Sequence, residues 1–350
     1  MDGSQGEGGG QILRTAVTFS VIKKRAVKVV KIRAGRETPG LMRQHVSVLK
    51  VLADVFGGEL EGAVEGSSTI KFAPRGQKRK AMNVDMGTAA SITLVLQAVV
   101  PAAALGGTSL VLDLVGGTDV PWSPTFDYLD YVVRGAFETV GIFFDVRVAR
   151  RGYYPRGGGR VSANVKEGGR IIGLNLTEDP EIHDVAVVSR CSSLPRHVAD
   201  RQLSAAVSTL ESEGLHVDKR ETFVGEALSP GSSVIAYSVG NDRMLGGDSI
   251  GARGKGAGVV GEEAARRFIA AWKSGACLDS NVADMIVPLL SLALEPSKVR
   301  VQTVTPHLRS GLQLAEQFTS CKWAAVDSGA SWLVNITPIR SDRDEQGHNV

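Results

Sequence analysis

The chain has 350 residues, of which 43% are hydrophobic and 22% charged, an ordinary globular composition with enough length for two domains. Its net charge of +3 permits an anionic substrate but is too small to indicate nucleic acid by itself. Three scattered cysteines with no Cys-x-x-Cys pair argue against a disulfide framework and against a structural zinc site.

Neither a secretion signal nor a membrane span is visible. The opening MDGSQGEGGG lacks the pattern of a signal peptide, and the longest apolar run, LVLQAVVPAAAL, is too short to cross a bilayer. We therefore expect a soluble, cytoplasmic protein with no membrane contact.

Helical and strand periodicities follow one another in three similar units. The first unit predicts helices over 11–21 and 40–56 and strands over 27–33, 59–64 and 69–72. The second predicts helices over 89–105 and 124–140 and strands over 82–85, 109–115, 143–149 and 159–165. The third predicts helices over 282–294 and 307–318 and strands over 170–176, 298–304, 322–327 and 331–336.

Each unit reads strand, helix, strand, helix, strand, strand, with the first strand of the first unit cut short. The second helix of each unit is expected to open beside a proline, namely Pro39, Pro124 or Pro306. Residues 181–277 break this rhythm, with helices expected over 195–214 and 261–275 and strands over 221–226 and 232–239.

These patterns predict an α/β (α+β) fold in which three βαβαββ repeats form the main domain, residues 1–180 and 278–340. A small inserted α/β domain, 181–277, interrupts the third repeat, and 341–350 form a polar tail.

The strongest local signal is the opening DGSQGEGGGQILRT. Closely spaced glycines let backbone N–H groups approach a ligand, and the helix that follows offers its N-terminus to an anion. Glu7 lies within this loop, where a carboxylate suits a phosphate only if a divalent metal lies between them. A flexible linker that caps the helix is an equal alternative, and no P-loop motif occurs in the chain.

Arginines gather in the stretch IRAGRETPGLMRQH. Arg33, Arg36 and Arg43 flank a turn before a helix start, and Arg14 is near in sequence, so their guanidinium groups suit phosphate oxygens. A solvated basic helix end is the alternative. Asp119 is interpreted as a turn or capping residue, and GYYPRGGGRV as a hairpin turn that could also hold RNA by stacking.

Of the six histidines, His307 stands directly after a predicted strand, at the start of a helix. A helix N-terminus disfavours imidazolium, and a neutral ring nitrogen is a nucleophile. Most histidines at such positions are solvated or structural, so the residue alone does not establish catalysis. No spacing typical of a histidine-based metal site occurs.

Taken together, eight segments resemble the RNA 3′-terminal phosphate cyclase family. They occur in the family's order and span nearly the whole chain: DGSQGEGGGQILRT, IRAGRETPGLMRQH, GTAASITLVLQ, GGTDVPWSPTFDYL, YYPRGGGRV, LPRHVADR, VADMIVPLLSLA and TPHL. The family's architecture, three βαβαββ repeats with a small inserted domain, agrees with the predicted units.

The resemblance implies an ATP-dependent conversion of an RNA 3′-terminal phosphate to a 2′,3′-cyclic phosphate, with ATP and RNA 3′ ends as partners. His307 matches the nucleophile that forms a covalent histidyl-AMP, which passes AMP to the RNA before the ring closes. Glu7 matches the residue that holds Mg²⁺ or Mn²⁺. The residues that match nucleotide contacts are Gln11, Arg14, Arg33, Arg36, Gln44, Gln97, Pro124, Tyr128 and Asp284.

Two motifs depart from the family. Where it commonly has Tyr-Leu-Ala-Asp-Gln, this chain has Asn281, Val282, Ala283, Asp284 and Met285, so an aromatic face for adenine is absent. The usual H-L-x-T-N after the histidine is HLRSG. These changes bear on ATP affinity or on nucleotide choice. The alternative function is a catalytically silent, cyclase-like RNA-binding protein in ribosome assembly, but relatives of that kind lack the histidine.

Overall fold

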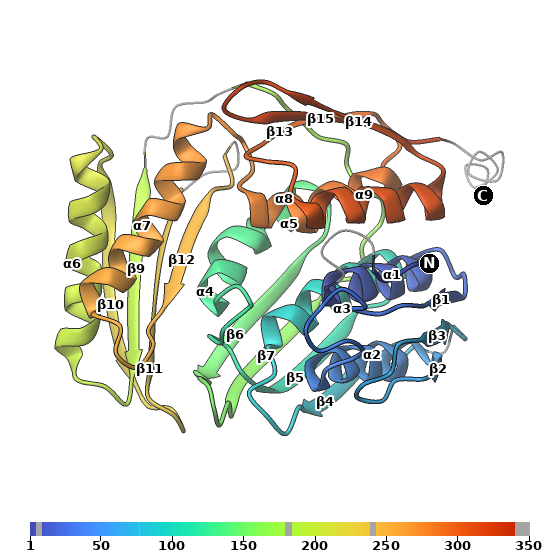
Figure 1. Cartoon of the computed structure of the whole chain (residues 1–350), viewed down its shortest axis with the longest axis horizontal. Helices are drawn as coiled ribbons and strands as arrows, with labels where there is room; N and C mark the ends of the chain where they lie inside the picture. The colour runs from blue at the N-terminus through green and yellow to red at the C-terminus, as the bar shows by residue number, and fades with distance from the viewer. Residues whose placement is uncertain (5–8, 77, 179–183, 239–242, 340–350) are drawn as a thin grey trace.

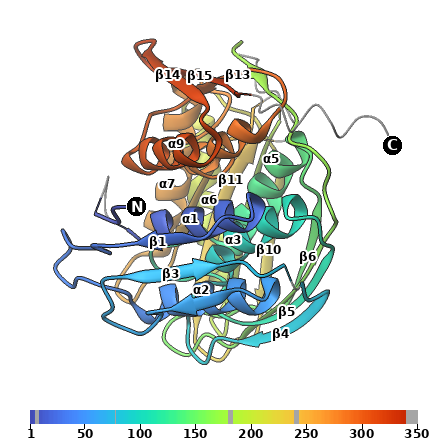
Figure 2. The same ribbon diagram turned by 90° about the vertical axis from the view of Figure 1, so that its right-hand side faces the viewer.

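The computed structural model describes residues 1–4, 9–76, 78–178, 184–238 and 243–339 (Figure 1). Within these ranges, helices alternate with strands that form four sheets, so the predicted α/β class is confirmed. Figures 1 and 2 show three of the sheets lying around a central group of helices, and the fourth, with two long helices, lying to one side.

The N-terminal unit begins with a helix rather than a strand. It contains α1 (Gly10–Ile22), β1 (Val27–Val29), α2 (Arg43–Phe56), β2 (Glu59–Glu61) and β3 (Ile70–Ala73), with the antiparallel sheet order β1-β3-β2. A single parallel bridge from Asp2 to Val30 occupies the place of the shortened first strand.

Two predictions in this unit are corrected. The strand expected over 27–33 ends at Val29, and Lys31 and Arg33 have φ angles of 55° and 53°, which an extended strand does not allow. Helix α2 begins at Arg43, with Met42 as its N-cap, so Pro39 lies outside its first turn.

The middle unit contains two helical regions and four strands. Its elements are β4 (Ala81–Asp85), α3 (Ile92–Leu105), β5 (Leu110–Gly116), α4 (Phe126–Tyr128), the π-helical turn η1 (Leu129–Val133), α5 (Arg134–Thr139), β6 (Phe144–Arg150) and β7 (Gly159–Val165). The sheet order is β4-β5-β7-β6, in which β4 and β5 run parallel and the other neighbours antiparallel. Antiparallel pairing of β6 with β7 agrees with the hairpin expected at GYYPRGGGRV.

The C-terminal unit has the same strand order. It contains β8 (Asn175–Leu176), α8 (Ser280–Ile286), the 3₁₀ turn η2 (Val287–Leu292), β13 (Ser297–Val301), α9 (Pro306–Thr319), β14 (Lys322–Asp327) and β15 (Trp332–Thr337). The sheet order is β14-β15-β13-β8, again with the first two strands in sequence parallel. This shared order supports the prediction that the units are repeats of one another, which stays a prediction.

Between β8 and α8 lies the additional sheet. Its elements are β9 (Val185–Ser192), α6 (Arg196–Ser212), β10 (Val217–Gly225), β11 (Gly231–Ser238), β12 (Gly246–Ile250) and α7 (Ala257–Lys273), in the sheet order β10-β9-β11-β12. A separate cluster of buried side chains lies between this sheet and its two helices. We refer to residues 184–273 as the inserted unit; the domain boundary itself stays a prediction.

Strands β9 and β12 were not expected from the sequence. Strand β12 reads GGDSI, without apolar alternation, because α7 packs directly over it. A Cβ atom on Gly247 would lie 2.3 Å from the carbonyl oxygen of Ala264, so glycine is required by this close approach.

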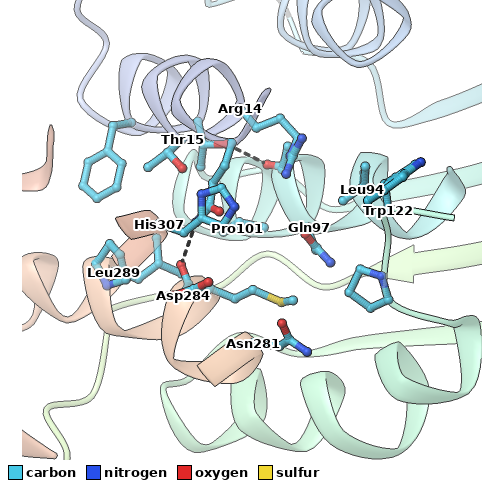
Figure 3. Close-up of a pocket in the computed structure, with 17 residues that line it drawn as sticks. Arg14, Thr15, Leu94, Gln97, Pro101, Trp122, Asn281, Asp284, Leu289 and His307 are labelled. Atoms are coloured by element: carbon cyan, nitrogen blue, oxygen red, sulfur yellow. Dashed lines mark hydrogen bonds between the residues drawn. The ribbon is translucent and has the colours of Figure 1, made fainter. Parts of the chain in front are cut away.

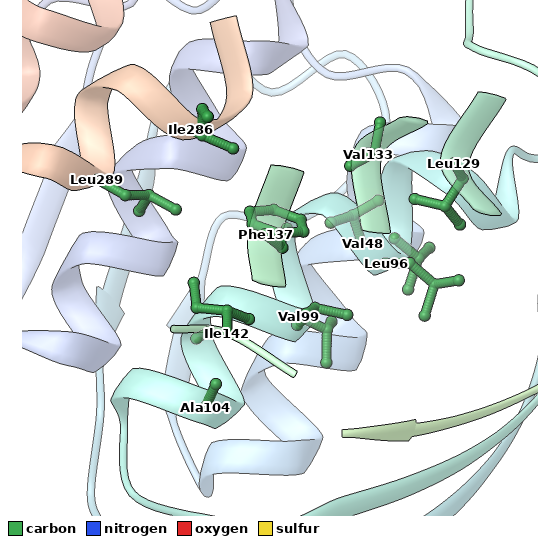
Figure 4. Close-up of a cluster of buried hydrophobic side chains, with 14 of the residues drawn as sticks. Val48, Leu96, Val99, Ala104, Leu129, Val133, Phe137, Ile142, Ile286 and Leu289 are labelled. Carbon is green, nitrogen blue, oxygen red and sulfur yellow. The ribbon is translucent and has the colours of Figure 1, made fainter. Parts of the chain in front are cut away.

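The main core surrounds α1, which packs against α2, α3 and α9. Buried side chains lie on every side of α1 and α3, as expected for helices enclosed by other elements. Figure 4 shows part of this core, in which Phe137 of α5 packs among Val99, Ile142 and Ile286. Since α1, α3, α8 and α9 meet in one core, their ends and exposed turns can form a single site.

No helix in the described ranges is long and apolar enough to cross a membrane. The three cysteines are buried and free of disulfide bonds.

Candidate active site

A cavity of about 190 Å³ opens where α1, α3, α8 and α9 converge (Figure 3). Eight of the residues singled out from the sequence line it together: Gln11, Arg14, Gln97, Pro124, Asn281, Asp284, Met285 and His307. They come from segments nearly 300 residues apart, so only the tertiary fold brings them into contact with one space.

His307 is held at the first turn of α9 by a cap that also joins α8. The hydroxyl of Thr305 accepts a hydrogen bond from the Leu308 amide at 2.8 Å and donates one to Oδ1 of Asp284 at 2.5 Å. Nε2 of Gln11 donates to the backbone carbonyl of Asp284 at 3.4 Å. These bonds fix α1, α8 and α9 relative to one another beside His307.

Arg14 provides positive charge in the wall opposite α8. Burial lowers the pKa of its guanidinium to about 10, so the group is still protonated at neutral pH. Within the described part of the chain it forms no ion pair or hydrogen bond with an acid. A half-buried cation with no acidic partner favours an anionic ligand in the cavity.

The first turn of α1 lies against further basic side chains. A Cβ atom on Gly9 would lie 3.6 Å from Cε1 of His307 and 3.9 Å from Nη2 of Arg36. One on Gly10 would lie only 2.3 Å from Nε2 of His45, so glycine keeps this turn open to its neighbours. Backbone N–H groups at such a helix start, with the guanidinium groups of Arg14 and Arg36 close by, are suited to phosphate.

His45 is a site residue that the sequence did not single out. It is 5% exposed, and burial, followed by the charges of Arg14 and Arg33, lowers the pKa of its imidazole to about 4. Its Nδ1 accepts a hydrogen bond from the Met42 amide at 3.0 Å. The ring is therefore neutral at physiological pH, and it accepts a hydrogen bond from the N-cap residue of α2 beside the site.

Gln97 of α3 presents an unsatisfied donor. Its Nε2 atom is buried and has no hydrogen-bond partner among the described residues. Because leaving a buried donor unpaired costs about 1–3 kcal/mol, this amide group favours a ligand that accepts a hydrogen bond inside the cavity.

Comparison with known proteins identifies a family. The family model described as RNA 3′-terminal phosphate cyclase matches residues 5–325. Three archaeal proteins with that name are similar over nearly their whole lengths. The one from Pyrobaculum aerophilum is 36% identical, over 98% of this chain and 99% of the relative. Those from Pyrococcus furiosus and Thermococcus kodakarensis are 40% and 41% identical, each over 91% of this chain and 92% of the relative.

The chain belongs to the RNA 3′-terminal phosphate cyclase family. The resemblance inferred from the sequence motifs and the prediction of an enzyme of this family are thereby confirmed.

Several residues matched to the family's nucleotide contacts do not line the cavity. Arg33 donates from Nη1 to the carbonyl of Gly40 at 3.1 Å, and burial, with the charge of Arg36, lowers its pKa. Arg36 is exposed beside Gly9, and Gln44 is half-buried on α2. Of these three, Arg36 lies closest to the N-terminus of α1, and the charge of Arg33 acts on His45 beside it.

Tyr128, Val282 and Ala283 are fully buried instead. The Tyr128 hydroxyl donates to Oδ1 of Asp279 at 2.6 Å, and Asp279 caps α8 and also accepts from the Gly246 amide at 2.8 Å. This contact joins the middle unit, the C-terminal unit and the inserted unit. The match of Tyr128 to an adenosine contact stays a prediction.

Glu7, the predicted metal ligand, lies outside the described residues. Among the described residues, no three His, Cys, Asp or Glu side chains are grouped closely enough to hold a metal ion. The metal assignment therefore stays a prediction.

Proposed function

We propose that this protein uses ATP to convert an RNA 3′-terminal phosphate into a 2′,3′-cyclic phosphate, through a covalent histidyl-AMP on His307. The observation that carries the proposal is that His307 lines the same cavity as Arg14, a cation with no acidic partner among the described residues. A nucleophile that shares a cavity with a phosphate-binding cation is the arrangement that nucleotidyl transfer needs.

A ring nitrogen of His307 attacks the α-phosphorus of ATP, and the bond from that phosphorus to the bridging oxygen breaks, so pyrophosphate leaves. An oxygen of the RNA 3′-phosphate then attacks the same phosphorus and releases the histidine. The neighbouring 2′-hydroxyl finally attacks the RNA phosphorus, expels AMP and closes the ring. The N-terminus of α9 favours the neutral ring that the first step requires.

Other residues have roles that follow from their places. Arg14 stabilises the negative charge that develops on the transferred phosphoryl group, and the free amide of Gln97 donates to an acceptor of the nucleotide. Arg33 and Arg36 approach the phosphates from the open N-terminus of α1. Asn281, Asp284 and Met285 of α8 form another part of the cavity lining.

Glu7 is proposed to hold Mg²⁺ or Mn²⁺, since a carboxylate among phosphates needs a cation between them. When bound, the metal would neutralise phosphate charge. A cytoplasmic location also remains a proposal, based on the sequence alone.

The test is to trap the covalent intermediate. Protein is incubated with α-labelled ATP and Mg²⁺ or Mn²⁺, denatured, and analysed for label that acid removes and base does not. We expect label on the wild type and on His216→Ala, whose histidine is exposed in the inserted unit, and none on His307→Ala.

Label that survives in His307→Ala would contradict the assignment of the nucleophile. Wild-type protein that takes no label from any of the four ribonucleoside triphosphates would favour the silent RNA-binding alternative.

A further inference from the structure

Trp122, in the loop between β5 and α4, is held in an unusual position. Its side chain is 93% exposed, whereas tryptophan in folded proteins is mostly buried on average. Its φ angle is 69°, in the left-handed region that bulky residues rarely adopt because it is strained. The fold therefore holds an indole ring in solvent although both the exposure of its apolar surface and its backbone conformation are unfavourable.

This indole separates two hollows. It lines the cavity of His307, at the end far from that histidine (Figure 3). It also lines a second hollow of about 270 Å³, to which the inserted unit contributes Ser249, Lys255 and Arg267. A planar ligand in the second hollow would therefore lie directly beside the catalytic cavity.

The charged groups of the second hollow are mostly paired with one another. Lys255 contacts Glu263, and Arg267 lies 3.7 Å from Oδ1 of Asp248. With two cations and two carboxylates, the hollow has no excess charge to attract a phosphate. Its unsatisfied feature is the aromatic surface, which is suited to stacking with a nucleobase.

The reaction proposed above brings two nucleotides together, and this inference rests on that proposed function. ATP must lie in the His307 cavity for its α-phosphorus to reach the ring. The RNA end then has to arrive from outside with its phosphate directed into the same cavity. The second hollow adjoins the cavity and is open to solvent, so it satisfies this requirement.

We propose that Trp122 stacks against the 3′-terminal base of the RNA, which lies in the hollow between the loop and the inserted unit. This contact positions the 3′-phosphate for transfer and assigns the inserted unit a part in binding the substrate. Since stacking accepts any base, the site orders the RNA end without strong sequence preference.

The test compares two oligoribonucleotides that end in a 3′-phosphate, one with a normal terminal nucleotide and one whose terminal ribose lacks its base. Wild-type protein is expected to bind the normal RNA at least about fivefold more tightly than the abasic one, the lower range for stacking of one base. Trp122→Ala should bind both RNAs with the affinity of the wild type for the abasic RNA.

Two further variants serve as a conservative replacement and as a control. Trp122→Phe keeps an aromatic face and should recover most of the preference for the normal RNA. Phe143→Ala removes another exposed aromatic side chain, which lines neither hollow, and should retain the wild-type preference. In steady-state assays, Trp122→Ala should raise the KM for RNA and not the KM for ATP.

The inference is wrong if wild type binds the two RNAs equally, or if Trp122→Ala weakens both to the same extent. A raised KM for ATP with an unchanged KM for RNA would also overturn it, because Trp122 would then stack with the adenine of ATP. Failure of the proposed function is distinguishable, since wild-type protein would then take no label from ATP.

Discussion

The low pKa of His45 predicts a specific dependence of stability on pH. In an unfolded chain the imidazole titrates near 6.5, whereas burial and two arginines lower its pKa to about 4 in the folded protein. Between these values the unfolded state binds more protons, so the free energy of unfolding falls as pH falls. The contribution of His45 is complete above about pH 6.5 and is lost on the way down to about pH 4.

The magnitude follows from the size of the shift. A difference of about 2.5 pKa units corresponds to about 3 kcal/mol over the full window, and to about 2 kcal/mol at pH 5. The matched variant is His45→Gln, because glutamine at this helix position can also accept a hydrogen bond from the N-cap amide without titrating.

Urea unfolding of both proteins between pH 5 and 8 provides the measurement. We expect the stability difference, wild type minus His45→Gln, to fall by about 2 kcal/mol from pH 8 to pH 5. His197→Gln, which changes an exposed histidine on α6, should show the pH dependence of the wild type. A difference that stays constant with pH, or an NMR titration of His45 near 6.5, would refute the reasoning.

Two buried contacts give further predictions, each measured by denaturant unfolding at neutral pH. Arg151 contacts Asp119 at 3.2 Å and Asp127 at 2.5 Å, all nearly inaccessible, so Arg151→Met should cost about 3–5 kcal/mol by leaving the buried Asp119 carboxylate without that cation, whereas Asp127 keeps Arg190 at 2.8 Å. Arg134→Met, which removes more exposed ion pairs, should cost less than about 1 kcal/mol, and equal losses would contradict this reasoning. Phe137→Ala should cost about 3–5 kcal/mol because a cavity opens in the main core, and a loss under about 1 kcal/mol would show that the core closes around it.

Regular periodicity explains which elements were predicted closely. Strand β14 has the predicted bounds, 322–327, and α9 extends the predicted helix over 307–318 by one residue at each end. Their side-chain patterns repeat with the periods of a strand and a helix, so each element can be recognised from its own residues alone. Strand β12 has no such pattern, because Gly247 is required by the close approach of α7 and Gly246 by the side chains of Tyr128 and Val132.

The candidate site likewise contains residues that the sequence indicated and residues that it did not. Motifs in the sequence pointed to His307 and Arg14, because such side chains close to predicted helix starts are recognisable in one dimension, whereas Gln97, in the interior of α3, was selected only through the resemblance to the family. His45 was missed although its neighbour Gln44 was selected. Consecutive residues of a helix point about 100° apart, and only the packing of α2 on α1 decides which one faces the site.

By itself, the sequence determined the α/β class and the family, because these depend on local periodicity and on short motifs, while the role of His307 as nucleophile stays a prediction. The tertiary structure alone decided the neutral state of His45, the lack of an acidic partner near Arg14 within the described residues, and the place of Trp122 between two hollows. Burial, charge pairing and exposure arise from residues distant in the chain, so no local pattern records them.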